Sequence, residues 1–388
     1  MRLCIDASNL RTGGGLTHLV ELLGNVDVAV HGFEQVFVWS SKATLDRIAD
    51  RSWLVKRSDP VLEENAFRRA IWQLRRLGTL ARRDGCNLIF VPGGSFATSF
   101  RPIVTMCRNM LPFEWREILR YGVSLQALRF LALRFTQARS FRRASGTIFL
   151  TRYAFDAVRT LAGPLTGAVQ IIPHGIDARF FAPVHSPPVA GNLSSPGRFE
   201  IVYVSIIDHY KHQTTAARAV ALLAEAGHLV SLTLIGPAYP PALRRLESVL
   251  REIDPDGLVV RYLGPIAHSE IHSAYARADI GLFASSCENM PNILLEEMAA
   301  GLPIACSDRG PMREILGDAG IFFDPEDVES ISAAILTLTA SADLRIRMAR
   351  AAQETARQYS WTRCAGETFG FLAQIAARKE IRAHADEV

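Results

Sequence analysis

Short apolar runs alternate with longer segments of mixed polarity along the whole chain. The runs occupy residues 3–7, 35–39, 87–91, 103–107, 146–150 and 169–172 in the first half, and 201–206, 229–235, 259–263, 280–284, 303–306 and 321–323 in the second. Runs of this length, spaced far enough apart for a helix, are typical of parallel strands joined by helical crossovers. The pattern therefore predicts an α/β protein built from two doubly wound, Rossmann-like domains.

The length of the chain supports this division into two domains. Its 388 residues exceed what a single core usually serves, and 49% of them are hydrophobic, which supplies ample core. A stretch rich in Pro, Gly and Ser between residues 182 and 197 is typical of a linker. We expect a first domain over residues 1–180, a linker over 181–198, a second domain over 199–360 and a C-terminal helix over 361–388 that could pack back on the first domain.

Composition limits the chemistry and the compartment. No uninterrupted apolar run approaches the roughly 20 residues that span a bilayer, and the N-terminus resembles a first strand rather than a signal peptide. The six cysteines lack Cys-x-x-Cys spacing, and four lie in or beside strand-like runs. This favours buried reduced thiols in a cytoplasmic protein over disulfides or a metal site. No histidine or acidic pair has convincing metal spacing, so we expect a site without metal or cofactor.

The strongest candidate site surrounds two glutamates. A buried strand is predicted just before Glu288, while Pro291 suits the first turn of a helix and Gly301 suits its end. Glu288 would therefore lie at a strand's carboxyl end, beside the free N–H groups of a helix start, and Glu296 would lie about two turns further on. Paired acceptors of this kind can hold the vicinal hydroxyls of a sugar. The spacing alone also fits two solvated glutamates with no function.

Residues 283–303 resemble a known family signature. A Glu, seven residues, a second Glu, a helix end of small residues and then Gly-x-Pro is the signature of retaining glycosyltransferases with two Rossmann-like domains, the GT-B architecture. Further segments similar to this family fall in the same order along the chain, at residues 6–18, 171–177, 203–213 and 314–325. The resemblance is strongest over residues 199–358. Its nearest look-alikes by motif act in bacterial surface polysaccharide assembly.

The resemblance implies a fold, a reaction and residue roles. Two domains would face each other across a cleft, the second holding a nucleotide diphosphate sugar and the first an acceptor. A hexose, by guess mannose-like, would move with retention to a hydroxyl of a glycan or lipid-linked saccharide. Glu288 and Lys211 would be catalytic, with Lys211 offsetting charge on the leaving diphosphate. The residues implied in donor binding, led by Glu296 at the ribose, are Glu296, Asn289, Met290, Pro291 and Gly236.

A glycine-rich loop and two histidines are further candidates for ligand contact. Gly13, Gly14 and Gly15 follow the first strand and precede a helical segment, so their backbone can approach a phosphate or an acceptor. They do not form the Gly-x-Gly-x-x-Gly fingerprint of a dehydrogenase, and a plain flexible turn is the alternative. For His18 and His174, contact with acceptor or sugar and a scaffold role both remain open.

Two positions depart from the family pattern. Ile206 stands where relatives commonly have an arginine five residues before the lysine, so the diphosphate clamp is either incomplete or completed by another cation. Many relatives have a histidine where this chain has Arg108 and Asn109. Either residue could donate to a sugar hydroxyl or a phosphate, or could serve only the structure of the loop.

Charge is distributed unevenly between the two halves. Residues 1–172 hold 24 Lys/Arg and 13 Asp/Glu, a net charge of +11, whereas the remainder has a net charge of −7. Arginines alternate with aromatic and leucine residues in segments 67–83 and 115–143. Such segments suit the surface of an anionic membrane, here the inner face of the cell membrane, although helices that bury their apolar face in the core are equally consistent. Nucleic acid fits poorly, because no recognition motif accompanies the charge.

Two other classes of function stay open beside the transferase. A sugar-nucleotide epimerase of the same architecture would bind the same donor without transferring its sugar. A non-catalytic sugar-nucleotide-binding subunit is the second, and the departures at Ile206 and Arg108 keep it under consideration.

Overall fold

The computed structural model describes residues 1–11, 13–184 and 197–385, and side chains up to Arg378. Most of the expected linker therefore lies outside the described residues. The chain forms two compact units. Unit 1 comprises Met1–Phe113, Val123–Gly175 and Ser360–Val388, and unit 2 comprises Glu114–Gly122 and Ile176–Tyr359. Among the described helices, none is both long and apolar enough to cross a membrane.

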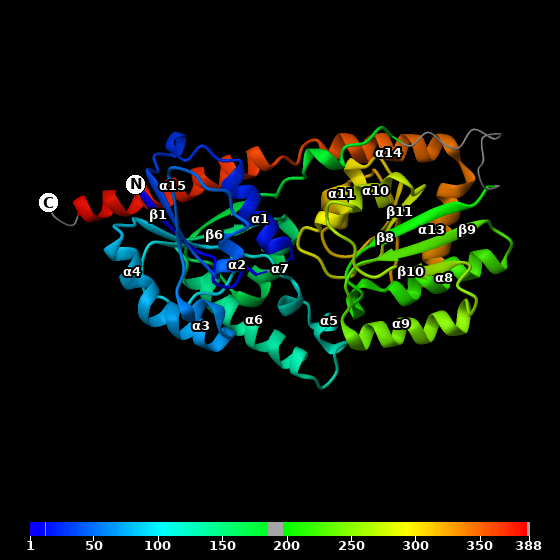
Figure 1. The fold of residues 1–388 in the computed structure, drawn as a ribbon, viewed down its shortest axis with the longest axis horizontal. Coiled ribbons are helices and arrows are strands. Elements are labelled where there is room, and N and C mark those ends of the chain that lie inside the picture. The colour runs from blue at the N-terminus through cyan, green and yellow to red at the C-terminus, as the bar shows by residue number, and fades with distance from the viewer. Residues whose placement is uncertain (12, 185–196, 386–388) are drawn as a thin grey trace. The chain divides into compact units, whose positions relative to one another are not determined.

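Unit 1 is built on a parallel seven-stranded sheet in the order β3-β2-β1-β4-β5-β6-β7 (Figure 1). Its strands are β1 Arg2–Asp6, β2 Gln35–Trp39, β3 Leu54–Arg57, β4 Leu88–Val91, β5 Ile103–Met106, β6 Gly146–Phe149 and β7 Ala168–Ile171. The residues of strands β1, β4, β5 and β6 are almost wholly buried, as expected for parallel strands covered on both faces. Only β3 was not predicted, because this half-buried edge strand contains two apolar residues followed by Lys56 and Arg57.

The helices of unit 1 lie on both sides of this sheet. They are α1 Gly13–Gly24, α2 Lys42–Leu45, α3 Ala66–Trp72, α4 Gly78–Arg83, α6 Leu125–Arg143, α7 Arg152–Ala162 and α15 Trp361–Ala385. Helix α1 buries Leu16, Leu19 and Leu23, which recur at helical spacing, and α15 packs against it. Within unit 1, the end of the chain thus returns to the helix that follows the first strand.

Unit 2 is built on a parallel six-stranded sheet in the order β10-β9-β8-β11-β12-β13. Its strands are β8 Phe199–Val204, β9 Val230–Ile235, β10 Val260–Tyr262, β11 Ile280–Phe283, β12 Ile304–Ser307 and β13 Ile321–Phe323. Its helices are α5 Trp115–Leu119, α8 Gln213–Glu225, α9 Pro240–Ile253, α10 Ile271–Ala276, α11 Asn292–Ala299, α12 Met312–Leu316, α13 Val328–Ala340 and α14 Ala342–Ala356. The two sheets confirm the predicted fold class of two doubly wound α/β domains.

One short segment of unit 2 comes from the first half of the chain. Residues 114–122, which contain α5, belong to unit 2, although the chain before and after them belongs to unit 1. The hydroxyl of Tyr121 donates to Asp208 at 2.9 Å, and Arg120 forms ion pairs with Glu117 and Glu326. This assignment differs from the expectation that residues 1–180 form one domain, because the contacts that decide it leave no pattern in the sequence.

The cores contain the thiols and one unexpected acid. All six cysteines are buried and free of disulfides, as predicted. Glu297, on α11, is fully buried above Gly281 of β11, where an added Cβ would lie 3.1 Å from its carboxyl oxygen. Among the described residues, neither carboxyl oxygen of Glu297 has a hydrogen-bond partner. Burial therefore raises the pKa of this carboxyl well above its ordinary value.

We expect Glu297→Gln to stabilise the protein at neutral and alkaline pH. The wild-type carboxyl contributes fully to stability below its ordinary pKa of 4.5, and stability falls as the pH rises from there through the raised pKa of the folded state. Each unit of pKa difference corresponds to about 1.4 kcal/mol. Urea unfolding from pH 4 to 9 should show a flatter profile for Glu297→Gln than for wild type. Glu247→Gln, which changes an exposed side chain, is the control and should follow wild type. An unchanged profile for Glu297→Gln would mean that the carboxyl of Glu297 is ionised in the folded protein.

Candidate functional site

The candidate residues of unit 2 meet at the point where its sheet changes direction. The chain proceeds outward from β8 through β9 to β10, then returns to place β11 on the other side of β8. Ligands bind outside the carboxyl ends of the strands at such a switch point. Lys211 follows β8 and Glu288 follows β11, so the topology brings these two loops together.

Lys211 and Glu288 form a buried ion pair. The ammonium group of Lys211 contacts Oε1 of Glu288, and the two side chains are 7% and 15% exposed. The same ammonium lies 5.5 Å from the ring centre of Phe283, at the end of β11. In this structure the two expected catalytic residues therefore neutralise each other, and an anionic ligand would have to compete with Glu288 for Lys211.

The loop that carries Lys211 is held in place by several polar contacts. Asp208 accepts a hydrogen bond from the backbone N–H of His209 at 2.7 Å as well as the one from Tyr121, and Tyr203 donates to the carbonyl of Lys211 at 2.9 Å. His212 has a left-handed backbone with φ of 51°, and its Nε2 lies 2.9 Å from Oγ of Ser286. Burial lowers the pKa of His212 to about 3, so its ring is neutral at pH 7.

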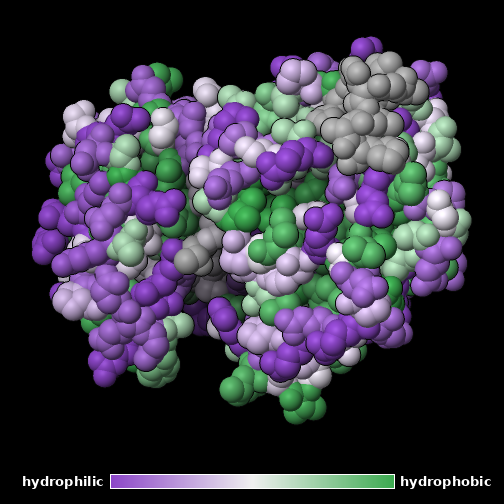
Figure 2. Space-filling view, turned by 45° about the vertical axis from the view of Figure 1, so that its right-hand side comes forward, coloured by the Kyte–Doolittle hydropathy of each residue, from purple (hydrophilic) through white to green (hydrophobic). Residues whose placement is uncertain are grey.

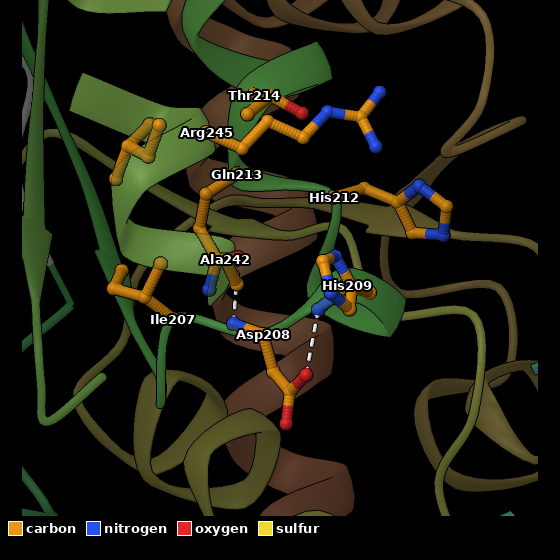
Figure 3. Close-up of a pocket in the computed structure, with 9 residues that line it drawn as sticks. Ile207, Asp208, His209, His212, Gln213, Thr214, Ala242 and Arg245 are labelled. Atoms are coloured by element: carbon orange, nitrogen blue, oxygen red, sulfur yellow. Dashed lines mark hydrogen bonds between the residues drawn. The ribbon is translucent and has the colours of Figure 1, made fainter. Parts of the chain in front are cut away.

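A small pocket of about 20 Å³ lies beside this loop (Figure 3). Asp208, His209, His212 and Gln213 line it from the loop and the start of α8, and Arg245 lines it from α9. The side chains of Arg245 and His212 extend toward the same side of the loop in Figure 3. Arg245 is exposed and brings a second positive charge near the segment that contains Lys211.

Glu296 is buried on α11, the helix that follows the Glu288 loop. The hydroxyl of Tyr275 donates to its Oε2 at 3.2 Å, and Nε2 of His268 lies 3.3 Å from its Oε1. His268 is half exposed, whereas Tyr275 is fully buried, so the two partners approach the carboxylate from solvent and from the core. Because both oxygens are engaged, Glu296 presents its acceptors in a fixed orientation.

The other expected donor-binding residues lie around the same loops. Asn289 and Met290 are buried directly after Glu288, and Pro291 has an extended backbone one residue before α11 rather than in its first turn. Gly236 follows β9 with φ of 144°, and an added Cβ would overlap the carbonyl oxygen of Ser205. Only glycine permits this close approach of the two strand ends.

The candidates of unit 1 form a separate cluster. Gly13, Gly14 and Gly15 are the first residues of α1, and Arg108 donates to the carbonyl of Gly14 at 2.6 Å while also contacting Nδ1 of His18. Desolvation by burial lowers the pKa of Arg108 to about 10 and that of His18 well below its ordinary value.

The two histidines of unit 1 are buried among aromatic and thiol groups. His174 stacks on Trp361 at the start of α15 with ring centres 5.5 Å apart, and Nε2 of His18 lies 3.6 Å from Sγ of Cys364. Asn109 accepts a hydrogen bond from the backbone N–H of Leu111 at 3.0 Å and so shapes its own loop. These contacts give both histidines and Asn109 scaffold partners.

The structure also brings in residues that sequence reasoning missed. Tyr121, Tyr275 and His268 contact the loop or the carboxylate of the site, but no motif marks them and they come from distant parts of the chain. Glu297 did leave a signal, because it directly precedes buried Met298 and Ala299 in a short helix that is mostly apolar. Within the described part of the chain, no group of three His, Cys, Asp or Glu side chains is arranged to hold a metal ion.

Part of unit 2 matches a known protein family. Residues 198–341 match the family described as "Glycosyl transferases group 1". The O-antigen chain mannosyltransferase B of Escherichia coli is 36% identical over 110 residues, which cover 28% of this chain and 29% of that protein. The chain spans half or less of the length of the curated relatives it matches most strongly.

Two solved structures share the fold at low identity. Sucrose-phosphate synthase from Thermosynechococcus elongatus superposes with a TM-score of 0.75 at 17% identity, covering 97% of this chain and 100% of that one. HepE from Anabaena, solved in complex with UDP and glucose, has a TM-score of 0.68 at 17% identity over 96% of this chain and 100% of its own. Residues 198–341 are thus similar to the group 1 glycosyltransferases, and the chain shares with these solved structures the fold of two parallel α/β units, the GT-B architecture.

Proposed function

We propose that this protein transfers a hexose from a nucleotide diphosphate sugar to a hydroxyl group, with retention of the anomeric configuration. The observation that carries the proposal is the buried Lys211–Glu288 pair at the switch point of unit 2, followed on the next helix by buried Glu296. A lysine, a loop carboxylate and a helix carboxylate match the three parts of the donor: its diphosphate, its sugar and its ribose. The match of residues 198–341 to the group 1 family supports the same reaction.

In this proposal the donor rearranges the ion pair. The diphosphate takes Lys211 as its cation, and Glu288 is released to accept hydrogen bonds from the sugar hydroxyls. Lys211 then offsets the charge that grows on the phosphate oxygen as its bond to the anomeric carbon breaks. The acceptor oxygen forms the new bond on the same face, and the departing phosphate takes its proton.

Glu296 and its neighbours would recognise the ribose. Its carboxylate oxygens are already oriented by Tyr275 and His268, and half-exposed His268 is the partner that ribose hydroxyls would replace. Arg245, which lines the pocket beside the Lys211 loop, is the candidate for the second cation that Ile206 does not supply.

The donor sugar and the place of action are finer parts of the proposal. A mannose-like sugar is suggested by the partial match to an O-antigen mannosyltransferase, and a uridine nucleotide by the complex of HepE. Unit 1 would present the acceptor, a saccharide of bacterial surface polysaccharide assembly. The protein would work in the cytoplasm, at the inner face of the cell membrane where such acceptors are lipid-linked.

Exposed apolar side chains of unit 1 support this membrane contact. Helix α6 exposes Leu125, Leu128 and Phe135 to 87%, 63% and 74%, and these residues recur at helical spacing beside exposed Arg129 and Arg139. Hydrophobic side chains project at the lower edge of Figure 2, the edge at which Figure 1 places the turn before α6. An apolar stripe flanked by arginines suits the headgroup region of an anionic bilayer.

Incubation with a panel of nucleotide sugars, followed by identification of the released nucleoside diphosphate, tests the proposal as a whole. A transferase releases the diphosphate in the presence of acceptor. An epimerase instead returns an altered nucleotide sugar, and a binding subunit returns the donor unchanged.

Glu296→Ala should weaken nucleoside diphosphate binding by about 1–3 kcal/mol, the usual cost of leaving polar partners unpaired. Glu288→Ala should depress turnover more than nucleotide affinity, because the Glu288 carboxylate would contact the sugar and not the nucleotide. Calorimetry measures the affinities and diphosphate release measures turnover, with exposed Glu247→Ala as the control. Unchanged nucleotide affinity in Glu296→Ala would remove the ribose assignment.

Transfer should proceed in the presence of EDTA, because Lys211 takes the place at the diphosphate that a metal occupies in other transferases. The product should keep the anomeric configuration of the donor. An NMR spectrum of the product reports the configuration directly. An inverted anomer, or activity restored only by added divalent cation, would contradict this part of the proposal.

Anionic liposomes should bind the protein at low salt and release it at high salt, since each basic side chain near the surface adds on the order of 1 kcal/mol that salt screens. Replacing Leu128 and Phe135 with serine, or Arg129 and Arg139 with glutamate, should reduce flotation. Charge reversal of Arg350, an exposed arginine of unit 2, serves as the control. Equal recovery with neutral and anionic vesicles, or none with either, would point to a soluble acceptor.

A further inference from the structure

The two partners of Glu296 both contact a short 3₁₀ turn near the start of the main segment of unit 2, Ala178–Phe180. Phe180 is buried, and its ring lies edge-on to the rings of His268 and Tyr275, with ring centres 5.8 Å and 6.3 Å apart. One apolar ring thus supports both the half-exposed and the buried partner of the carboxylate.

Arg179, in the same turn, is held at several points. Its Nε lies 3.3 Å from Oδ2 of Asp177, and its backbone N–H donates to Oδ1 of the same carboxylate at 2.9 Å. The guanidinium carbon lies 4.9 Å from the centre of the Phe180 ring. The Nη2 atom of Arg179 contacts Nδ1 of His268 and lies 3.5 Å from Nε2 of that ring, so Nδ1 is its partner.

The contact with Arg179 decides which nitrogen of His268 carries the ring hydrogen. A guanidinium group has only donors, so the Nδ1 atom that faces Arg179 must accept. In the neutral imidazole the hydrogen is then on Nε2, which lies 3.3 Å from Oε1 of Glu296. A chain of donors therefore leads from Arg179 through His268 to the carboxylate.

His268 and Glu296 thus present a donor and an acceptor side by side. Their separation of 3.3 Å exceeds the usual range of about 2.7–3.2 Å for N–H···O hydrogen bonds, so the direct bond is weak. A hydroxyl group between them would accept from Nε2 and donate to Oε1, which exchanges one weak bond for two. A ring with its hydrogen on Nδ1 would instead present two acceptors, and a single hydroxyl could not satisfy both.

We propose that His268 is a second ribose-binding residue beside Glu296, and that Arg179 is the positioning residue that makes His268 a donor. Resting on the proposed function, one ribose hydroxyl of the nucleotide would bridge Nε2 of His268 and Oε1 of Glu296. The ring of His268 keeps its place on Arg179 and Phe180 when the hydroxyl replaces its direct contact with the carboxylate. Recognition of the ribose thus depends on a turn that lies outside the glutamate signature.

Ring ¹⁵N NMR of the full-length protein without nucleotide tests the positioning role. His268, assigned by the loss of its signals in His268→Ala, should show the tautomer with its hydrogen on Nε2. Arg179→Leu should shift the ring toward a mixture of both tautomers, whereas Arg179→Lys should keep the Nε2–H form, because an ammonium group also only donates. A hydrogen on Nδ1 in the wild type, or an unchanged spectrum in Arg179→Leu, would overturn the positioning role.

Calorimetry tests the ribose contact, with uridine diphosphate and guanosine diphosphate each compared with its 2′,3′-dideoxy analogue. Arg179→Leu should weaken binding of the ribonucleotide about threefold to tenfold, the usual net effect of one hydrogen bond, and change that of the dideoxy analogue less than about twofold. His268→Ala should lose the same preference for ribose. Adding Arg179→Leu to His268→Ala should have no further effect, because Arg179 acts through the ring.

Arg357→Leu is the matched control. Arg357 lies over the ring of the neighbouring Phe181 at 5.1 Å and forms an ion pair with Glu354. This substitution also removes a guanidinium group from an aromatic ring, but it should leave the tautomer of His268 and both nucleotide affinities unchanged. Thermal unfolding verifies that each variant is folded.

Equal losses for the ribonucleotide and its dideoxy analogue in Arg179→Leu, or additive losses in the double variant, would overturn the ribose contact. Nucleoside diphosphate release from donor sugars is measured on the same samples. Absence of release, with the tautomer and the preference for ribose intact, would sink the proposed transfer and leave the nucleotide site standing. Normal release by a wild type that shows no preference for ribose would overturn this inference and leave the transfer standing.

Discussion

Both units depend on one topological constraint, the way a parallel sheet is wound. Right-handed crossovers send the chain outward from the first strand and then back to its other side, so loops distant in sequence meet at the carboxyl edge. In unit 2 this constraint places the loops after β8 and β11 together and creates the Lys211–Glu288 pair. In unit 1 it places the loop after β1 beside the end of β4.

The carboxyl edges of the two sheets differ in the partners of their cationic side chains. In unit 2, Lys211 is buried against Glu288, so its cation is neutralised within the protein. In unit 1, Arg108 donates to the carbonyl of Gly14 and contacts the ring of His18. The pairing lowers the cost of burying Lys211, because a charge buried alone is disfavoured far more than a charge buried with its opposite.

The site is supported by groups that do not belong to its motif. Tyr121, Tyr203 and Asp208 fix the Lys211 loop, and Tyr275 and His268 orient Glu296. Tyr121 belongs to a segment that the chain contributes to unit 2 between two parts of unit 1. Such partners hold a charged side chain in one rotamer, which is what precise recognition of a ligand requires.

Most of the fold and the central site residues were accessible from the sequence. The apolar runs located every described strand except β3, because burial on both faces leaves a nearly continuous hydrophobic record and an edge strand does not. The spacing of Glu288 and Glu296 placed one in a loop and the other on a helix, where the structure has them. The apolar runs also placed Lys211 after the first strand of unit 2 and Gly13, Gly14 and Gly15 after the first strand of unit 1.

Only the tertiary structure decided which of these residues touch. The pairing of Lys211 with Glu288, the burial of Glu297 without a partner and the scaffold contacts of His18 and His174 depend on packing between elements far apart in the chain. The assignment of residues 114–122 to unit 2 depends on hydrogen bonds and ion pairs that leave no local pattern. Hydrophobic periodicity records whether a side chain is buried, but it carries no information on which neighbour it meets, and that choice belongs to the fold.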